Sequence, residues 1–294
     1  MSIAIVQRFL RLLVLTLVGL LLCAPAYAKP LLWAVRQGDT TIYLFGTVHL
    51  LPSDTDWMSP KLEQALDKSQ RLSIELVDDD PVTMNMLVLK YGLDLQHPLS
   101  QKLAAADQAR LRRAADTAHV PVGTLDRMQP WLAALTLTVA PLMQAGMDPS
   151  QGVDKQLKAR MTQAGKPVDG LENAEQQLKI FATMPEAMQL DMLRQTFREV
   201  DEGPKKLREL VDAWKNGDTT VIARLESVEL KKDSPALYKS LIVDRNKAWA
   251  QILAKRLRAP ASGTSIVAVG AGHLAGPDSL QKQLQSLGFT VTVE

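Results

Sequence analysis

Two copies of one short motif constrain the fold of this chain more than any other feature. Near the start, Tyr43–His49 consists of an apolar run, a glycine and, three residues later, a histidine. Near the end, Val267–His273 repeats that order, and the two motifs contain two of the four histidines. The glycines are expected to allow tight backbone turns. Because α/β proteins usually place their chemistry at strand ends, we expect two neighbouring strands that deliver His49 and His273 into one cleft.

The N-terminal segment has the features of an export signal. Two arginines precede the apolar stretch Leu12–Leu22, and Ala26–Ala28 fits a small-x-small cleavage site. The stretch is short for a membrane span. Cys23 follows a leucine, where a lipoprotein signal requires a small residue. We therefore predict a signal peptide over 1–28 and a periplasmic or secreted mature protein over 29–294, with no stable membrane span after cleavage.

Cleavage would also change the chemistry available to the chain. Cys23 is the only cysteine, so the mature protein would have no thiolate and no disulfide. This excludes cysteine catalysis, iron–sulfur clusters and cysteine zinc sites. Two basic residues leave with the signal, so basic and acidic side chains balance at 32 each. A neutral chain gives no electrostatic case for nucleic-acid binding.

Strand patterns occupy the two ends of the mature chain, and helical patterns fill its middle. The predicted strands are Leu31–Arg36, Thr41–Phe45, Arg71–Val77, Ser265–Val269 and Phe289–Val293. Lys166–Val168 leads into Gly170–Glu172, for which we expect a further short strand. This order predicts an α/β (α+β) fold, with a mixed central sheet built from N- and C-terminal strands and a large helical insertion or cap over about 83–258. No linker or long repeat marks a boundary, so we predict a single domain over 29–294.

One helical segment, Pro130–Met147, is strongly apolar. Pro141 lies within it and predicts a kink or two short helices. We expect the segment to pack against neighbouring helices or to form a wall of a substrate groove. Exposed leucines would instead indicate a homodimer interface or a membrane-facing surface. The other long helical patterns are Ser100–Ala118, Ala174–Val200, Pro204–Asn216 and Pro235–Arg258.

Glu75 is the third candidate for chemistry. Alternation in its strand places Glu75 on one face with Ser73 and Val77. A solvated glutamate on a half-exposed strand is the simplest interpretation, because a buried carboxylate needs a partner. Beside His49 and His273, however, Glu75 completes a His/His/Glu set. Such a set either holds a metal ion that lowers the pKa of bound water to about 7, or acts as a metal-free acid–base set.

Together these residues resemble the TraB/GumN family. The resemblance rests on Tyr43–His49, Ile74–Leu76, Gly152–Asp154, Gly170–Glu172, Gln176–Gln177, Trp214, Gly217–Asp218, Arg245–Asn246, Trp249 and Val269–Leu274. It spans essentially the whole mature chain. The family is similar to Tiki proteins, metal-dependent peptidases that carry two Gly-x-x-His motifs and an essential glutamate. More distantly it resembles the erythromycin-esterase and ChaN groups, the first hydrolytic and the second haem-binding.

The resemblance implies a function and a set of site residues. It implies an exported metal-dependent hydrolase, closest to a Tiki-like peptidase, that acts on a peptide or a small molecule. His49, Glu75 and His273 would bind a divalent metal ion and act in catalysis. Arg245 would bind a carboxylate or stabilise an oxyanion. The candidates of second rank, which would orient a histidine or ligate the metal, are Asp154, Glu172 and Asn246.

Other interpretations of the same residues stay open. A binding protein would use the cleft for haem, a metal or a small ligand without turnover. Tyrosine is a common haem ligand, but only Tyr43 lies close to a histidine in the sequence. A metal-free esterase-like hydrolase is the third alternative. Asp54 and Asp278, each five residues after a motif histidine, are expected to organise turns.

Overall fold

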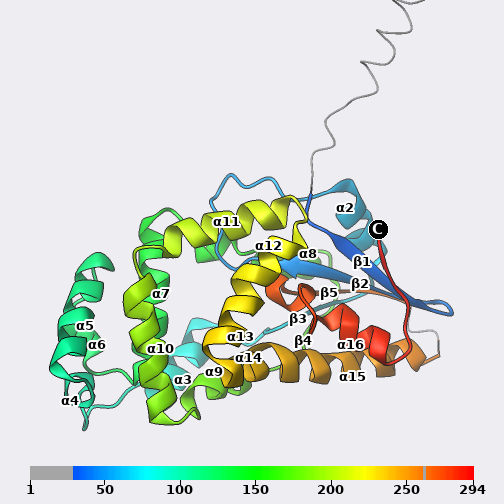
Figure 1. Cartoon of the computed structure of the whole chain (residues 1–294). Coiled ribbons are helices and arrows are strands. Elements are labelled where there is room, and N and C mark those ends of the chain that lie inside the picture. Colours follow the sequence, from blue (N-terminus) through cyan, green and yellow to red (C-terminus); the bar gives the residue numbers. More distant parts are fainter. Residues whose placement is uncertain (1–28, 261–262) are drawn as a thin grey trace, which may run out of the picture.

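The computed structural model describes residues 29–260 and 263–294. The predicted signal peptide, 1–28, therefore lies outside the described residues. Figure 1 shows a sheet with flanking helices at one end of the molecule and a group of helices at the other. Among the helices of the two described ranges, none is both long and apolar enough to cross a membrane.

Six strands form one mixed sheet in the order β4-β3-β5-β2-β1-β6. The strands are β1 (Leu32–Gln37), β2 (Thr40–Thr47), β3 (Leu72–Ile74), β4 (Val168–Gly170), β5 (Thr264–Gly270) and β6 (Val291–Val293). β2, β5, β3 and β4 run parallel, whereas β1 pairs antiparallel with both β2 and β6. The predicted α/β fold, with a mixed sheet assembled from both ends of the chain, is confirmed.

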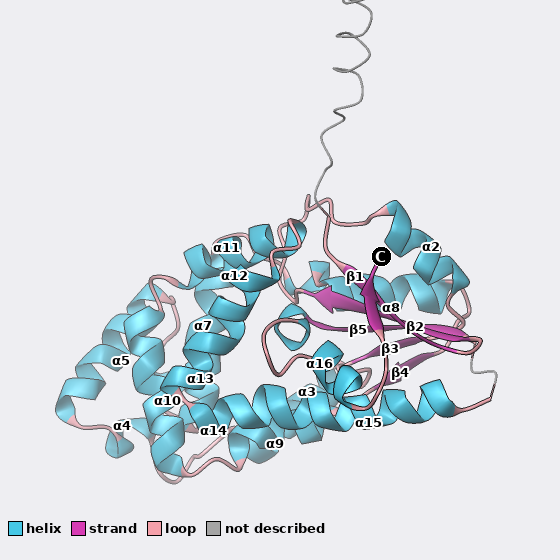
Figure 2. Cartoon of the chain, turned by 45° about the vertical axis from the view of Figure 1, so that its right-hand side comes forward, coloured by secondary structure: helices cyan, strands magenta, loops and turns pink. Residues whose placement is uncertain are grey.

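The two strands that carry the motifs are parallel neighbours, as predicted. Thr47 at the end of β2 lies opposite Gly270 at the end of β5. Both strands are apolar because helices cover both faces of the sheet. Helices α2 (Pro60–Lys68) and α8 (Val153–Gln163) pack on one face, and α15 (Asp244–Arg258) and α16 (Leu280–Ser286) pack on the other (Figure 2). The two motifs therefore leave the sheet at the same edge.

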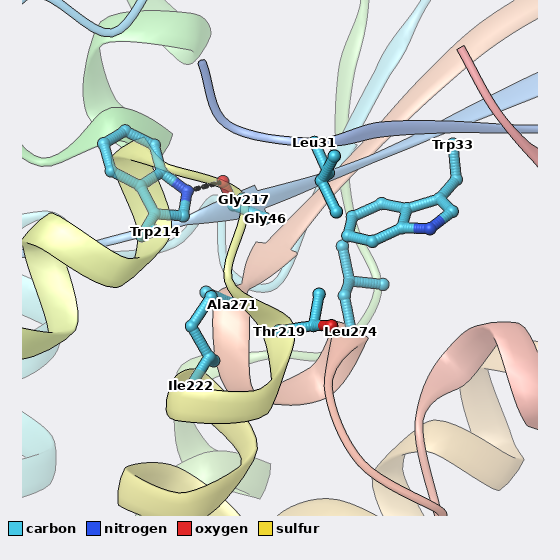
Figure 3. A pocket seen from close by; sticks show the side chains of 9 residues that line it. All are labelled: Leu31, Trp33, Gly46, Trp214, Gly217, Thr219, Ile222, Ala271 and Leu274. Carbon is cyan, nitrogen blue, oxygen red and sulfur yellow. Dashed lines mark hydrogen bonds between the residues drawn. The ribbon is translucent and has the colours of Figure 1, made fainter. Parts of the chain in front are cut away.

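The motif glycines permit close approach. Gly46 and Gly270 are absent from the positions with positive φ in the described chain, and Gly270 leads directly into the tight 3₁₀ turn Ala271–Leu274. A Cβ on Gly46 would lie 3.2 Å from the Cα atom of Ala271. The indole of Trp214 on α11 (Gly203–Lys215) donates a 2.8 Å hydrogen bond to the Gly46 carbonyl (Figure 3). The cavity in Figure 3 measures about 10 Å³, which is roughly the room for one water molecule and not for a substrate.

The predicted strand Arg71–Val77 is shorter than expected. β3 ends at Ile74, so Glu75 follows the strand instead of lying inside it. The backbone carbonyls of Ile74 and Glu75 still accept hydrogen bonds from Leu171 (2.8 Å) and Glu172 (3.1 Å). The carboxylate of Glu75 accepts a hydrogen bond from the N–H of Gly270, the last residue of β5, so Glu75 lies at the same edge of the sheet as the end of β5.

The middle of the chain is helical, as expected. Its elements are α3 (Pro81–Tyr91), α4 (Leu99–Lys102), α5 (Ala105–Thr117), α6 (Val122–Leu125), α7 (Pro130–Gln144), the 3₁₀ turn η1 (Pro149–Gln151), α9 (Ala174–Ala182), α10 (Glu186–Glu199), α12 (Thr219–Ala223), α13 (Glu229–Asp233) and α14 (Pro235–Tyr238). Two π-helical turns, η2 (Arg224–Val228) and η3 (Lys239–Val243), and the 3₁₀ turn η4 (Ala271–Leu274) complete the set.

Helix α7 runs as one helix through Pro141, so two short helices are the wrong alternative. It packs against α5, α10 and α11, which confirms the expected helix packing. Its leucines are buried or half-buried, and its buried face includes Trp131 and Leu137. This helix therefore shows none of the exposed leucines that would have indicated a dimer interface or a membrane-facing surface.

Three of the other predicted helices differ in detail from the structure. Ser100–Ala118 is divided into α4 and α5, and Ala174–Val200 into α9 and α10. Pro185 precedes α10, because proline favours a helix start over a helix interior. Pro235–Arg258 is helical throughout but contains the π turn η3 between α14 and α15. The expected C-terminal glycine of α11, Gly217, has a φ of +68°.

Candidate active site

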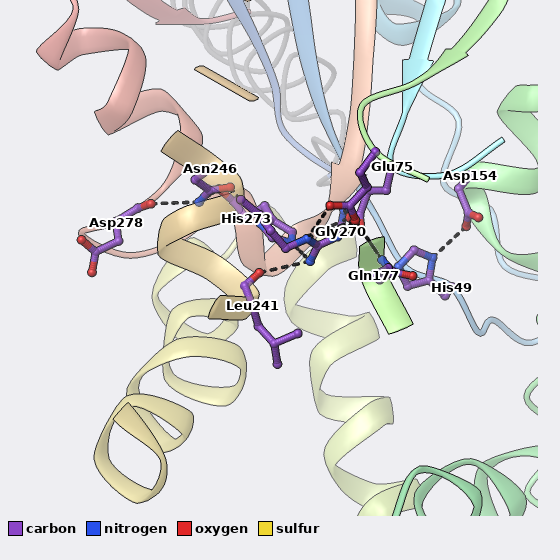
Figure 4. Close-up of polar contacts among 11 residues, drawn as sticks. His49, Glu75, Asp154, Gln177, Leu241, Asn246, Gly270, His273 and Asp278 are labelled. Carbon is purple, nitrogen blue, oxygen red and sulfur yellow. Dashed lines mark hydrogen bonds and ion pairs between the residues drawn. The ribbon is translucent and has the colours of Figure 1, made fainter. Parts of the chain in front are cut away.

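His49, Glu75 and His273 converge on Gly270. A Cβ built on Gly270 would lie 3.2 Å from Oε1 of Glu75, 3.7 Å from Cδ2 of His273 and 3.8 Å from Nε2 of His49. The three side chains come from the segments that follow β3, β5 and β2. Figure 4 shows them at this one edge of the sheet. Both histidines thus lie near one glycine at the same sheet edge, but only His49 lines the adjacent pocket, so the shared cleft and the chemical roles stay predictions.

Glu75 is buried rather than solvated, with a side-chain exposure of 9 %. Its Oε1 accepts a 2.7 Å hydrogen bond from the backbone N–H of Gly270. Its Oε2 accepts hydrogen bonds from Arg245 (2.5 Å) and Gln177 (3.3 Å). Burial alone would raise the pKa of Glu75, but the positive charges of His273 in its protonated form, Arg245 and His49 lower it to about 2.

Arg245 lies at the centre of the site with a side-chain exposure of 10 %. Its Nε is 3.1 Å from both carboxylate oxygens of Glu172, and its Nη2 donates to Glu172 and Glu75 at 2.5 Å. Its Nη1 donates to the carbonyl of Leu241 at 3.1 Å. Burial lowers the pKa of Arg245, but the two carboxylates outweigh burial and raise it. Because burial dominates at Glu172, the pKa of that carboxyl is raised.

His273 is neutral, with its proton on Nδ1. The Nδ2 of Asn246 donates to the carbonyls of His273 (3.2 Å) and Asp278 (2.8 Å), so Oδ1 of Asn246 is the atom that accepts from His273 Nδ1 at 2.8 Å. The unprotonated Nε2 accepts from Nη1 of Arg245 at 2.9 Å. Burial lowers the pKa of His273 to about 3, although the charge of Glu75 opposes this. Trp249 lies against both groups, 4.5 Å from the imidazole and 4.6 Å from the guanidinium.

His49 differs from His273 in exposure and in charge. Its side chain is 58 % exposed, and its Nδ1 lies 3.1 Å from Oδ1 of Asp154 on α8. Partial burial lowers the pKa of His49, but the hydrogen bond to Asp154 and the charges of Glu75, Asp154 and Glu226 raise it to about 9. At neutral pH the site therefore combines one imidazolium with one neutral imidazole.

A polar pocket of about 170 Å³ opens beside the cluster. Its lining residues are Thr47, His49, Ile74, Glu75, Leu76, Asp79, Asp154, Gln177 and Ala268. Thr47 is 2 % exposed, and in the described part of the chain its hydroxyl has no hydrogen-bond partner. A buried polar atom without a partner costs about 1–3 kcal/mol. Thr47 thus contributes a buried, unbonded hydroxyl to the wall of this pocket.

All three candidates of second rank belong to the cluster. Asp154 binds His49, Glu172 binds Arg245, and Asn246 binds His273. The two aspartates that follow the motifs lie in turns, as expected. Of these, Asp278 also accepts a 2.8 Å hydrogen bond from the Tyr238 hydroxyl. Tyr43 packs in the hydrophobic core on the face covered by α2 and α8.

Sequence reasoning missed Glu226. It lies in the π turn η2, and its Cβ would be 2.9 Å from a Cβ placed on Gly272. Its charge acts on His49, and burial raises the pKa of Glu226. Its neighbours along the chain form no motif, so only the folded structure identifies it.

Within residues 29–260 and 263–294, no group of three or more His, Cys, Asp or Glu side chains is arranged to hold a metal ion.

The sequence is similar to known proteins over nearly all of the described residues. The TraB/PrgY/gumN family profile matches residues 31–293. YbaP of Escherichia coli (strain K12), an uncharacterized protein, is 25 % identical over 264 residues, which cover 88 % of this chain and 93 % of YbaP. YbaP of Shigella flexneri matches with the same identity and coverage. No solved structure matches the chain at a significant level. Because the family profile covers nearly all of the described residues, the chain belongs to the TraB/PrgY/gumN family.

Proposed function

We propose that this protein is a hydrolase that cleaves a carbonyl compound, with peptides as the expected substrate class. The observation that carries the proposal is the convergence of His49, Glu75 and His273 on Gly270, beside a pocket with an unbonded hydroxyl. Acidic, basic and cationic groups that meet beside a cavity are the components of a hydrolytic site. The names of the two YbaP relatives give no activity, so the likeness to Tiki peptidases stays part of this proposal.

The proposal includes a divalent metal ion as cofactor, with His49, Glu75 and His273 as ligands. The donor atoms are of the right kind, because two imidazoles and a carboxylate form a common hydrolytic ligand set. Each imidazole is hydrogen-bonded through Nδ1, to Asp154 or to Asn246, so Nε2 would be the ligand atom; at His273 the guanidinium of Arg245 would have to give up its contact with Nε2. A metal ion at such a site lowers the pKa of its bound water to about 7. Because His49 is an imidazolium at neutral pH, it would have to lose the proton on Nε2 before that atom could bind a metal ion.

A metal-free reaction is the second candidate, and the position of Arg245 favours it. The guanidinium already contacts Oε2 of Glu75 and Nε2 of His273, so a fixed positive charge stands between two of the proposed ligands. In this candidate, Glu75 accepts a proton from water while the oxygen of that water attacks the carbonyl carbon. The bond from the carbonyl carbon to the leaving group then breaks as the protonated His49 gives its proton to the leaving group, and transfer of the proton from Glu75 to His49 restores the site. For Arg245 to stabilise the oxyanion, one of its N–H groups would have to leave its present partner.

Measurement of metal content together with hydrolysis separates these candidates. The protein is purified without chelator, and bound metal is counted before peptide and ester substrates are tested with and without chelator. Loss of activity with loss of metal, restored by one divalent ion, supports the metal-dependent form. Activity that survives complete metal removal supports the metal-free form. If no substrate is turned over but haem or another ligand binds at the pocket, a binding protein replaces the hydrolase.

We also propose that the reaction takes place after export. The support is the arrangement within 1–28 of two arginines, an apolar stretch and a small-x-small site. Mass determination of the N-terminus in protein secreted by an expressing bacterium tests this. A mature chain that begins at Lys29 is the expected result, and an intact N-terminus in the cytoplasm would contradict it.

A further inference from the structure

A second and larger cavity lies next to the polar pocket, among the helices of the insertion. Its volume is about 430 Å³, against about 170 Å³ for the polar pocket. Pockets that hold small organic ligands usually measure about 300–1,000 Å³. The polar pocket alone is therefore smaller than the usual range for a small organic ligand, whereas the volume of the larger cavity lies within that range.

The walls of this cavity are mostly apolar. Residues from eight elements line it, among them Leu135, Phe181, Met192, Leu207, Leu225 and Leu230, and we call this cavity the apolar groove. These six side chains are only half-buried, so they leave apolar surface open to water. Charged groups at the groove pair with one another, since Lys206 lies 3.1 Å from Glu199 and 3.4 Å from Glu229. An open apolar groove of this kind is typical of a ligand site.

Three residues connect the groove to the candidate active site. Gln177 donates to Glu75 in the polar pocket, and Phe181 in the groove lies four residues later on the same face of α9. Leu241 lines the groove, and its carbonyl accepts a hydrogen bond from Arg245. The third connection is Glu226, which lines the groove while its Cβ lies 2.9 Å from a Cβ placed on Gly272, the residue before His273. The groove thus begins about one helical turn from the polar pocket.

We propose that the apolar groove binds an aliphatic part of the substrate while the substrate's carbonyl lies in the polar pocket. The position of the carbonyl rests on the proposed function, but the binding of the aliphatic part does not. An acyl chain and the apolar side chains of a peptide share this chemistry. Because most of the lining side chains are apolar and Lys206 is held by Glu199 and Glu229, binding of the aliphatic part depends on apolar contact rather than on charge.

A binding experiment tests the groove without any requirement for turnover. The probe is 11-(dansylamino)undecanoate, whose fluorescence rises in apolar surroundings, and butyrate, octanoate and dodecanoate compete with it. We expect about fourfold tighter competition for each added methylene until the groove is filled. Trileucine and triserine are the peptide competitors. Stronger competition by trileucine assigns the groove to peptide side chains, and stronger competition by dodecanoate assigns it to acyl chains.

Two tryptophan variants within η2 serve as the test of the groove and its matched control. Leu225→Trp fills the groove from η2, whereas Val228→Trp adds the same side chain to a position of η2 that is 55 % exposed. Leu225→Trp should weaken probe binding at least tenfold and Val228→Trp should leave it unchanged. Leu230→Trp, from α13, replaces Leu225→Trp if that variant does not fold.

The outcomes separate this proposal from the proposed function. Probe binding that is equal in the groove-filling and control variants, or independent of chain length, overturns the apolar groove even if the protein is a hydrolase. Chain-length-dependent binding without hydrolysis of any substrate supports the groove and counts against the hydrolase.

Discussion

Arg245 and Glu75 form a 2.5 Å ion pair between two side chains that are each about nine-tenths buried. The two residues are 170 positions apart in the sequence. Arg245 also binds Glu172 and Nε2 of His273, so one cation holds together residues from β3, β4 and β5 or the segments after them. Removal of one partner from such a pair leaves a buried charge without compensation.

This pair leads to a first prediction about stability. Arg245→Ala should lower the free energy of unfolding by about 3–5 kcal/mol, because it leaves Glu75 and Glu172 buried without their cation. His49→Ala should cost clearly less than Arg245→Ala, since the exposed ring packs little and loses only its contact with Asp154 and its charge near Glu75. Both variants should lose hydrolysis. Urea unfolding measures the free energy of unfolding of each variant, and an activity assay measures hydrolysis. An equal loss of stability in the two variants would contradict the assignment of Arg245 as buried and His49 as exposed.

Thr47→Val tests the unbonded hydroxyl. Valine keeps the branched shape, so removal of a buried polar atom without a partner should leave stability unchanged or raise it by about 1–3 kcal/mol. If the hydroxyl binds substrate, KM should rise. Ser69→Ala is the matched control, because that buried hydroxyl donates a 2.7 Å hydrogen bond to Ala65 and its loss should lower stability without an effect on KM. Lower stability in Thr47→Val would show that the hydroxyl has a partner.

Gly270→Ala tests the point of convergence. The added Cβ would lie 3.2 Å from Oε1 of Glu75, so the carboxylate must move away from the backbone N–H that it accepts from. We expect loss of activity and a stability cost of about 1–3 kcal/mol. Gly123→Ala, in α6 with no atom within 4 Å of the new Cβ, is the control and should gain up to about 1 kcal/mol. Full activity in Gly270→Ala would place the chemistry elsewhere.

Acid should destabilise the protein through Glu175. Hydrogen bonds from Tyr91, Lys90 and Lys179 lower the pKa of Glu175 from 4.5 to about 2. The lowered pKa means that the ionised carboxylate contributes stability above pH 4.5, and that this contribution is lost as the pH falls towards 2. Thermal unfolding of the wild type should therefore depend more steeply on pH in this window than unfolding of Glu175→Gln. If the unfolding temperatures of the wild type and of Glu175→Gln changed with pH in parallel, the carboxylate of Glu175 would not contribute the predicted stability.

The sequence by itself determined the sheet edge and most of the candidate site. Two apolar runs that end in the same motif require strands covered on both faces, and β2 and β5 are indeed parallel neighbours. Short-range patterns sufficed here, because strand burial and helix starts depend on nearby residues. Their limits appear at Glu75, where the alternation in Arg71–Val77 predicted a longer strand than the structure contains.

Only the tertiary structure decided the electrostatics of the site. The pKa of His273 is lowered to about 3 and that of His49 is raised to about 9, although the two lie in matching motifs. Burial and the approach of Arg245 or Asp154 cause this difference, and both act through space between residues far apart in the chain. For the same reason Glu226 and the unbonded hydroxyl of Thr47 were visible only after folding.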